Sequence, residues 1–487
     1  MPAKSVDSRA NQLATVAGLT HGYYTDPALG DLLSNLTEAL PPFSKDELAA
    51  EGPTDGEGHA TAMLKAAAVR AMGRHYERQV HTPAELVTRA AQASTKAKIA
   101  WREARKNNSF AQFKPFLETQ FAIAKEFAEH WGYTNDIYDP LLDEYEPGLS
   151  YAWIKERFDA LKPRLKELIA KVAEASQSDP ELAKPGKLMH RHVAAETQLP
   201  FSRRMAEAVG FDFDHGRFDV STHPFTGGPA YNDVRLTTRV DEDYFPSCLF
   251  ASIHEAGHGI HSQKLDPSLS RIPFRYGLAL AESQSRFFEN ILGRSKAFWE
   301  YWYPALQEAV PEFADVSLDD WYRGINHSHP SLIRVEADEL TYGMHIMLRF
   351  ELEHAVVNGD LAVGDLPGAW NDGMEELLGI RPDTDATGVL QDIHWSMGAI
   401  GYFPDYLLGS MLSSQLWKAF ASEESNAEEA VRRGELKAVG EFLRTRIQTF
   451  GGTMTFSEMT ATACGEDFDA EPYVSYLTDK YSDIYRL

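Results

Sequence analysis

Cysteine is scarce in this sequence: only Cys248 and Cys464 occur among 487 residues, and they lie far apart. Two distant cysteines do not form the dense disulfide framework of small secreted domains, and they are typical of a reducing compartment. Apolar runs are short as well, because none reaches the roughly 18 residues that a membrane-spanning helix needs. The first residues lack the positively charged and then apolar layout of a secretory signal. We therefore expect a cytoplasmic protein.

Positive charge is also in short supply. The sequence has 47 Lys and Arg residues against 72 Asp and Glu residues, a formal net charge of −25 at pH 7. Charge of this sign repels phosphate backbones and anionic lipids, so we expect neither nucleic acid nor a membrane as the main partner. Hydrophobic residues make up 43% of the chain and charged residues 24%, which excludes intrinsic disorder and indicates a globular protein with a large core.

Helical periodicity dominates the sequence. Residues 82–85, Thr-Pro-Ala-Glu, fit a capping box with proline at the first helical position. Farther along, apolar residues recur at steps of three and four and predict an amphipathic helix that Pro163 kinks. These apolar residues are Ile154, Phe158, Leu161, Leu165 and Leu168. Segments rich in proline, glycine or acidic residues predict breaks at 41–58, 139–147 and 177–187.

One segment departs from the helical pattern. Between His223 and Val240, a glycine-containing turn leads into alternating polar and β-branched or apolar residues, which predicts a strand. The chain length suggests roughly three domains, and a single large helical domain fits it equally well. We expect residues 1–200 to form a helical region that covers a groove. Residues 201–487 are expected to form a second helical region, continuous with the first, which carries the motif described next.

The strongest motif is His-Glu-Ala-Gly-His at 254–258, which fits the H-E-x-x-H pattern of zinc peptidases. Residues four apart on a helix differ by about 40° of rotation and about 6 Å of rise. His254 and His258 therefore share one face and can hold one metal ion, while Glu255 points toward the open side of that ion. The alternative is a helix with two solvent-facing histidines and a chance glutamate.

Catalytic zinc takes three protein ligands and leaves one position for water, so a third ligand is needed. The metzincin pattern requires a histidine at the position that holds Lys264, which excludes that class. His261 lies about 10 Å along the helix axis from His254 and fits a packed histidine better than a ligand. We favour Glu282, on a following helix that can return antiparallel to the first, and Glu289 is its rival.

With these residues identified, the sequence resembles the carboxypeptidase Taq family of zinc-type metallocarboxypeptidases over most of its length. Further signatures of that family occur in order: His-Pro-Phe at 223–225, Asp-x-Arg-x-Thr at 233–237, Ile-Arg-x-x-Ala-Asp at 333–338 and Gly-x-x-Gln-Asp-x-His-Trp at 388–395. One departure is Ala281, which precedes Glu282 where the family usually has histidine. The loss of a side chain that supports a metal ligand costs about 10- to 100-fold in affinity or activity.

The resemblance implies a mainly α fold: a large helical zincin-like (gluzincin-type) architecture with a deep groove and a small antiparallel β-sheet next to the active site. It also implies a homodimer. Among the substrate-binding residues it favours Arg334 for the terminal carboxylate of a peptide. It assigns Asp233, Arg235 and Thr237 to the wall of the site on the substrate side, and His223 is expected to bind substrate as well.

Peptide hydrolysis at neutral pH needs an activated water and a polarised carbonyl. A zinc ion lowers the pKa of its bound water toward about 7 and acts as a Lewis acid. Glu255 is expected to take the proton from that water and pass it to the departing amine. His394 is our first candidate for stabilising the oxyanion, and Tyr402 is the second. For each, the alternative is a packed side chain with a satisfied hydrogen bond.

A carboxypeptidase must also recognise a free terminal carboxylate, and the planar guanidinium of arginine can bond both carboxylate oxygens. Arg334 is the favoured residue, and its alternative role is an ion pair with Glu336 or Asp338. Arg349 and Arg235 are further candidates. Arg235 lies on the predicted strand, which could bind a peptide as an added strand.

We therefore predict a metal-dependent carboxypeptidase of broad specificity that removes C-terminal residues from peptides one at a time. One divalent ion per chain is expected, Zn²⁺ first, with Co²⁺ or Mn²⁺ as alternatives. Arg286 and Phe287 are expected to line a pocket for the terminal side chain, which would favour apolar or aromatic residues. Two other functions stay open: an endo-acting metallo-oligopeptidase with the same chemistry, and a helical binding protein with a vestigial metal site.

Overall fold

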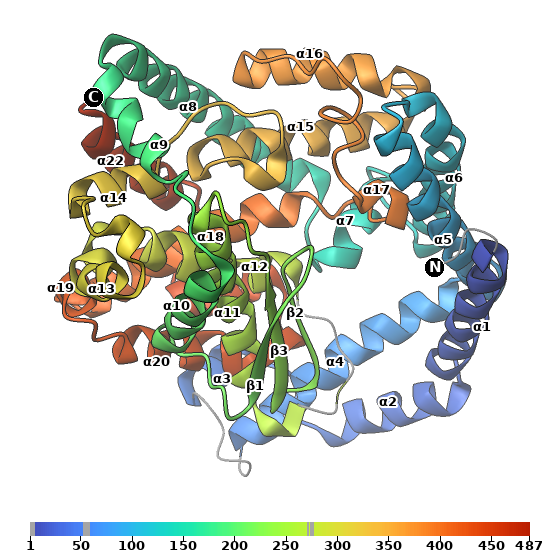
Figure 1. Cartoon of the computed structure of the whole chain (residues 1–487). Coiled ribbons are helices and arrows are strands. Elements are labelled where there is room, and N and C mark those ends of the chain that lie inside the picture. The colour runs from blue at the N-terminus through green and yellow to red at the C-terminus, as the bar shows by residue number, and fades with distance from the viewer. Residues whose placement is uncertain (1–4, 52–58, 270–271, 273–276) are drawn as a thin grey trace.

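The computed structural model describes residues 5–51, 59–269, 272 and 277–487. Helices form most of the molecule, and one small sheet lies among them (Figure 1). The first helices are α1 Val6–Tyr24, α2 Pro27–Ala39, α3 Lys45–Glu51, α4 His59–His81, α5 Ala84–Lys106, α6 Phe110–Trp131, α7 Asp139–Tyr145, α8 Tyr151–Ser178, α9 Lys184–Leu188 and α10 Ala195–Ala208. The strands are β1 Gly216–Val220, β2 Phe225–Ala230 and β3 Asp233–Thr238.

The chain after the sheet is again helical. Its α-helices are α11 Phe245–Gln263, α12 Leu278–Arg286, α13 Lys296–Ala309, α14 Leu318–Ile325, α15 Glu339–Asn358, α16 Leu366–Leu378, α17 His394–Met397, α18 Pro404–Glu423, α19 Ala427–Arg432, α20 Lys437–Arg446, α21 Phe456–Cys464 and α22 Glu471–Tyr485. The π-helix η4 is Phe287–Gly293, and the short 3₁₀ helices are η2 Pro180–Ala183, η3 Pro267–Leu269, η5 Pro311–Phe313, η6 Arg334–Glu336, η7 Val363–Asp365 and η8 Gln448–Thr453.

The predicted amphipathic helix is confirmed as α8. Ser150 starts it, because its hydroxyl accepts a hydrogen bond from the backbone N–H of Trp153. All five residues of the predicted apolar stripe are buried, and the helix continues through Pro163 to Ser178. The predicted capping box at 82–85 is wrong. Helix α5 begins there, but the Thr82 hydroxyl donates back to the Arg78 carbonyl and so completes the end of α4.

The segments predicted as breaks contain short helices. Helix α7 falls inside 139–147, η2 and α9 fall inside 177–187, and α3 falls inside 41–58, of which residues 52–58 lie outside the described part. Proline stands in the first turn of α7, η2 and α9. A proline in this position starts a helix rather than breaking it, because the first N–H groups of a helix have no intrahelical partner.

The sheet has the order β1-β3-β2 and is mixed. Strand β2 pairs with β3 in antiparallel fashion, as expected, but β1 pairs with β3 in parallel, so the expectation of a purely antiparallel sheet is wrong. The predicted strand segment resolves into β2 and β3, whereas β1 was not predicted. Val234 and Leu236 of β3 are buried, and Asp233 and Arg235 project from the opposite face because successive side chains alternate along a strand.

Helix α12 is held at backbone distance between α11 and α18. A Cβ atom at Gly257 of α11 would lie 2.6 Å from the Cα of Ser285, and one at Gly409 of α18 would lie 2.6 Å from the Cβ of Glu282. Any larger side chain at either glycine would push α12 away. The close packing therefore sets the position of Glu282 relative to α11.

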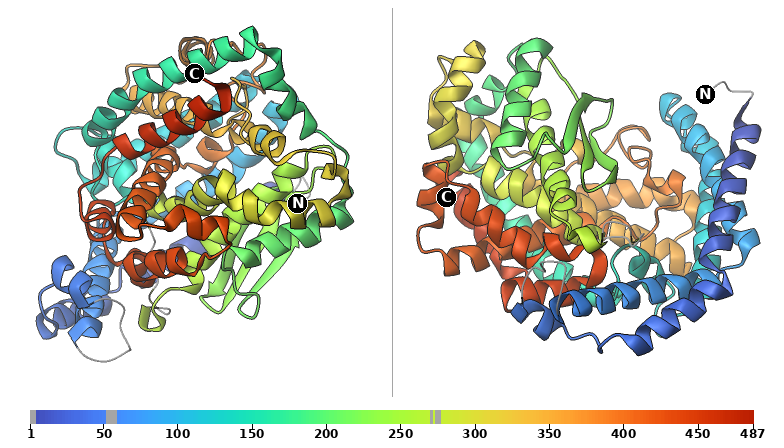
Figure 2. Two further views of the ribbon diagram at one scale, coloured as in Figure 1. Left: turned by 90° about the vertical axis from the view of Figure 1, so that its left-hand side faces the viewer. Right: turned by 90° about the horizontal axis from the view of Figure 1, so that it is seen from below.

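Buried apolar side chains from residues 1–200 and from residues 201–487 form one continuous cluster. The first helices, drawn in blue, extend as an arm along one side of the molecule (Figure 2). Among the described residues, no helix combines the length and the apolar character that crossing a membrane requires.

Candidate metal centre and active site

A cavity of about 2110 Å³ opens beside the sheet and α11. Its walls come mainly from residues 222–294, 324–342 and 402–406. Of the described residues before 201, Gly186 and His190 line it and the others do not. Coverage of the groove by the N-terminal region therefore stays a prediction.

Three predicted ligands meet in the wall of this cavity. His254 and His258 come from α11 and Glu282 comes from α12, and one ligand atom of each lies within 4.8 Å of the other two. The Oε2 atom of Glu282 is 3.4 Å from Nε2 of His258 and 3.6 Å from Nε2 of His254. Two imidazole nitrogens and one carboxylate oxygen form a donor set that suits zinc in a catalytic site.

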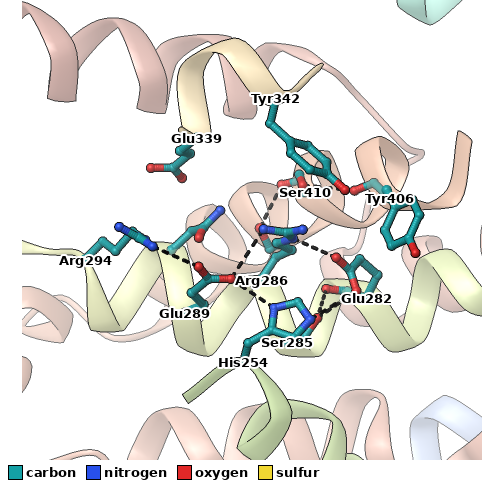
Figure 3. Close-up of polar contacts among 12 residues, drawn as sticks. His254, Glu282, Ser285, Arg286, Glu289, Arg294, Glu339, Tyr342, Tyr406 and Ser410 are labelled. Carbon is teal, nitrogen blue, oxygen red and sulfur yellow. Dashed lines mark hydrogen bonds and ion pairs between the residues drawn. The ribbon is translucent and has the colours of Figure 1, made fainter. Parts of the chain in front are cut away.

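Glu289 contacts the far side of one of these histidines. Its Oε2 atom lies 2.9 Å from Nδ1 of His254, so it orients the ring with Nε2 toward Glu282 (Figure 3). Arg286 and Arg294 donate to the same carboxylate at 3.3 and 3.1 Å. Burial alone would raise the pKa of Glu289, but His254 and the two arginines lower it to about 2. The carboxylate is therefore charged and accepts a hydrogen bond from the Nδ1–H of the imidazole.

Glu282 is fixed by its own partners. Arg286 Nε donates to Oε1 at 2.7 Å and the hydroxyl of Ser285 donates to Oε2 at 3.0 Å. Burial opposes the charge, but Arg286 and then His254 hold the pKa of Glu282 well below its ordinary value. The guanidinium of Arg286 also lies 4.8 Å from the ring centre of Tyr342. Arg286 lines the cavity as expected, but Phe287 is buried and is not part of the wall, so the aromatic character expected of this pocket is wrong.

Glu255 lines the cavity beside the three ligands and is 7% exposed. The hydroxyl of Thr226 shares its one hydrogen between Oε2 of Glu255, at 2.6 Å, and the backbone carbonyl of Glu255, at 2.9 Å. Strand β2 is thereby attached to α11 at the candidate general base. The sequence analysis did not predict a role for Thr226. The only signal in the sequence is that Thr226 directly follows the 223–225 motif.

Arg334 faces the cavity from η6 and is 4% exposed. Its Nε and Nη2 donate to Oδ1 of Asp392 at 3.1 and 2.8 Å, and its Nη1 donates to the Tyr342 hydroxyl at 2.8 Å. The expected alternative, a pair with Glu336 or Asp338, is wrong because the paired acid is Asp392. Burial opposes ionisation, but the arginines Arg334 and Arg349 hold the pKa of Asp392 far below its ordinary value.

The other two arginine candidates lie elsewhere. Arg349 is fully buried, and its guanidinium bonds Asp392, Gln391 and the His345 carbonyl. Arg235 is exposed and forms a two-fold contact with Asp233, at 2.9 and 2.8 Å. Neither arginine is part of the cavity wall.

Four further predicted residues differ in their position relative to the cavity. Tyr402 and His223 line it, and burial raises the pKa of Tyr402 to about 12, so its hydroxyl stays protonated. His394 is buried behind the wall, with Nε2 3.0 Å from the Tyr406 hydroxyl. Burial and then Arg334 lower the pKa of His394 to about 3. The Thr237 hydroxyl accepts from the backbone N–H of Phe225 at 2.9 Å and joins β3 to β2.

The comparison with known families agrees with this arrangement. The family model described as carboxypeptidase Taq (M32) metallopeptidase matches residues 1–481. The chain belongs to this family. It is 40% identical over 396 residues to carboxypeptidase 1 of Bacillus subtilis, a match that covers 81% of this chain and 78% of that relative. Thermostable carboxypeptidase 1 of Thermus thermophilus is 35% identical, with 100% of this chain and 93% of that relative covered.

Solved structures extend the likeness to the fold. The crystal structure of an M32 carboxypeptidase from Deinococcus radiodurans R1 matches with a TM-score of 0.89 at 32% identity, covering 100% of this chain and 94% of that one. The structure of Trypanosoma cruzi metallocarboxypeptidase 1 matches with a TM-score of 0.87 at 31% identity, covering 99% and 93%. The protein is therefore an M32 metallocarboxypeptidase, and its family implies a divalent metal, which the His-His-Glu donor set fits.

Proposed function

We propose that this M32 enzyme releases C-terminal amino acids from peptides one at a time, with broad specificity. His254, His258 and Glu282 hold one Zn²⁺ ion, Glu255 acts as the general base, and Arg334 binds the terminal carboxylate. The observation that carries the proposal is that one cavity wall brings together the three-ligand donor set, a buried carboxylate and a buried arginine.

A divalent ion at this site supplies Lewis acidity toward the substrate carbonyl and lowers the pKa of a bound water. The protein provides the proton transfer. Thr226 orients the Glu255 carboxylate through the hydrogen bond to Oε2 at 2.6 Å, and this carboxylate accepts the proton of the attacking water. The same carboxyl group then donates that proton to the departing amine.

Arg334 suits the terminal carboxylate because its partners leave donors available. A guanidinium has five N–H donors, and three hydrogen bonds hold this one to Asp392 and Tyr342. Asp392 also pairs with Arg349, so two arginines share one acid and the cluster carries a net positive charge. This local charge attracts a carboxylate into a molecule that is otherwise strongly acidic.

For the oxyanion, the geometry favours Tyr402 over His394. Tyr402 lines the cavity with a protonated hydroxyl, whereas His394 supports the neighbouring Tyr406 from behind the wall. The strand most suited to pair with a peptide is β2 rather than β3, because β3 is paired on both sides and β2 is an edge strand that lines the cavity. Asp233, Arg235 and Thr237 of β3 would then support the binding strand from its paired side.

Peptide-ladder mass spectrometry tests this function. Purified protein with added Zn²⁺ should shorten a free-carboxylate peptide one residue at a time, and it should leave the C-terminally amidated peptide intact. Internal cleavage of the amidated peptide would identify an endo-acting oligopeptidase. Absence of any cleavage with Zn²⁺, Co²⁺ or Mn²⁺ would identify a binding protein with a vestigial metal site.

We also propose that the enzyme is a cytoplasmic homodimer. The near absence of cysteine supports a reducing compartment, and the likeness to its family supports the dimer. Light scattering coupled to size-exclusion chromatography should give twice the chain mass of 54.5 kDa.

A further inference from the structure

Asp405 is a buried carboxyl in the cavity wall that the proposed mechanism does not use. It lies in the first turn of α18, is 3% exposed and lines the same cavity as the metal ligands. Its Oδ2 atom is buried, and none of the described residues forms a hydrogen bond with it. A buried polar atom of this kind loses its water on folding and gains nothing in return. A ligand that donates a hydrogen bond to it would remove that deficit.

The surroundings of Asp405 favour a positively charged ligand. Burial first, and then repulsion by Glu146, Glu353 and Glu282, raises the pKa of Asp405 well above its ordinary value. An approaching cation offsets this repulsion and stabilises the ionised carboxylate. The N-terminal end of α18 contributes in the same direction, because the helix dipole favours negative charge there. Asp405 is not part of the His-His-Glu ligand group, so the metal does not fulfil this role.

The position of Asp405 relates it to one part of the substrate. Its neighbours Tyr402 and Tyr406 also line the cavity, with ring centres 5.3 Å apart. The guanidinium of Arg334 lies 4.9 Å from the ring centre of Tyr406. If the cleaved bond is at the metal and the terminal carboxylate is at Arg334, the terminal residue spans the interval between them. The first turn of α18 then borders its side chain, a step that rests on the proposed function.

We propose that Asp405 binds the cationic end of a lysine or arginine side chain at the C-terminal position of the peptide. The small side chain of Ala281, which lines the same cavity beside Glu282, leaves room for a long side chain. The inference replaces the aromatic pocket expected from the sequence with an acidic one. Within the broad specificity proposed above, Asp405 then gives peptides with a basic terminal residue a higher rate of cleavage than peptides with a neutral one.

The test compares two peptides that differ only at the last residue, arginine or its neutral isostere citrulline. Wild-type enzyme should show a kcat/KM about 10- to 100-fold higher for the arginine peptide, the usual effect of one charge-assisted hydrogen bond. In Asp405→Asn, the ratio of the two kcat/KM values should fall toward one. Asp243→Asn is the matched control, because this exposed acid also lines the cavity and its loss should leave the ratio as in the wild type.

A second measurement needs only the wild-type protein. Free arginine, as a reaction product, should inhibit cleavage of a neutral peptide at a concentration at least about 10-fold lower than free citrulline. Equal rates for both peptides and equal inhibition by both amino acids would overturn the role of Asp405 and leave the carboxypeptidase function intact. Failure to cleave either peptide would instead remove the proposed function itself.

Discussion

Single charged side chains set the geometry of the metal centre. Arg286 donates to the proposed ligand Glu282 at 2.7 Å and to Glu289 at 3.3 Å, and Glu289 in turn contacts His254. One arginine therefore contacts both a proposed ligand and the acid that orients a second one. Such partners fix the ring orientation and the basicity of a metal-binding histidine.

We expect Glu255→Gln to lower kcat by at least about 100-fold, the usual range for loss of a general base. The amide keeps the shape of the side chain but cannot accept a proton. Metal content, measured by mass spectrometry, should stay that of the wild type because residue 255 is not one of the three ligands. Retention of more than about a tenth of the wild-type activity would remove Glu255 from the role of general base.

Glu282→Ala should reduce bound metal far more than Glu289→Ala. The first change removes one of three ligands, whereas the second removes an orienting partner and should weaken metal binding by about 10- to 100-fold. Titration of each metal-free variant with Zn²⁺ measures both affinities. The reverse order of affinities would show that the ligand assignment is wrong.

The stability contributed by Glu289 should depend on pH. Its pKa in the folded protein is about 2, below the ordinary value of 4.5, so the unfolded chain takes up a proton first as the pH falls. The stabilisation is therefore complete above pH 4.5 and is lost as the pH falls from 4.5 toward 2. The Tm difference between metal-free wild type and Glu289→Gln should shrink across this window. A constant difference would contradict the assigned charge.

Among the structural elements, α12 decides how the centre is assembled. Gly257 and Gly409 let it approach both α11 and α18, and its α-helical turns continue into the π-helix η4. The wider turn of a π-helix changes which side chains share a face, and such turns occur often at functional sites. It is on this turn that Glu289 reaches His254.

The proposed carboxylate clamp depends on three elements that meet at one acid. Arg334 comes from η6, Arg349 and Tyr342 come from α15, and Asp392 precedes α17. This arrangement explains why Arg334 can lie in a cavity wall at 4% exposure and remain charged. The charge is balanced from behind, and the side that faces the cavity stays available.

Arg334→Ala should raise KM for free-carboxylate peptides and lower kcat/KM by roughly 30- to several-thousand-fold. The loss arises because a charge-assisted contact to both carboxylate oxygens has no replacement. Tyr342→Phe is the matched variant: it keeps the arginine and removes one of its hydrogen bonds, so its loss should be about 10-fold or less. Amidated peptides lack the terminal negative charge. Their kcat/KM with either variant should therefore be no lower than with the wild type.

Equal losses on free and amidated peptides, together with a lower Tm, would assign Arg334 a purely structural role. The clamp would then need another donor from the cavity wall. Arg349 and Arg235 do not supply it, because one is enclosed behind Asp392 and the other lies on the outer face of the sheet.

The molecule as a whole carries a charge of −25. Acidic residues outnumber arginines in the cavity wall too, but arginines cluster at two points of the candidate site. Arg286 and Arg294 surround the metal-site acids, and Arg334 and Arg349 share Asp392. These pairs are buried, so salt screens them less than surface charges. The role proposed for the positive charge at Arg334 and Arg349 is to attract the terminal carboxylate of a peptide.

Removal of the metal should stop turnover without unfolding the protein. Dialysis against a chelator should lower activity by at least about 100-fold, the minimum expected for loss of catalytic metal and base chemistry. Far-ultraviolet circular dichroism should keep its helical signal, because one large apolar core already joins both parts of the chain. Tm should fall, since a metal that binds only the folded state stabilises it. Loss of the helical signal would show that the metal is needed for folding.

Local spacing alone determined the two histidines and the glutamate of the 254–258 motif, and also the buried stripe of α8. A helix repeats every 3.6 residues, so a short window of sequence already specifies which side chains share a face. The same helical periodicity placed Glu282 on a following helix. It could not give the distance in space between Glu282 and His258. The family likeness added the order of the remaining motifs.

Only the tertiary structure decided which side chains meet. The pairing of Arg334 with Asp392, the contact of Glu289 with His254 and the parallel pairing of β1 with β3 all join residues that are distant in sequence. Such contacts depend on how whole elements pack, at glycine positions that permit backbone approach, and no local pattern encodes that packing. The environment of the Asp405 Oδ2 atom also depends on the packing of whole elements. Whether a described residue forms a hydrogen bond with this buried oxygen is decided only when the surrounding elements are in place.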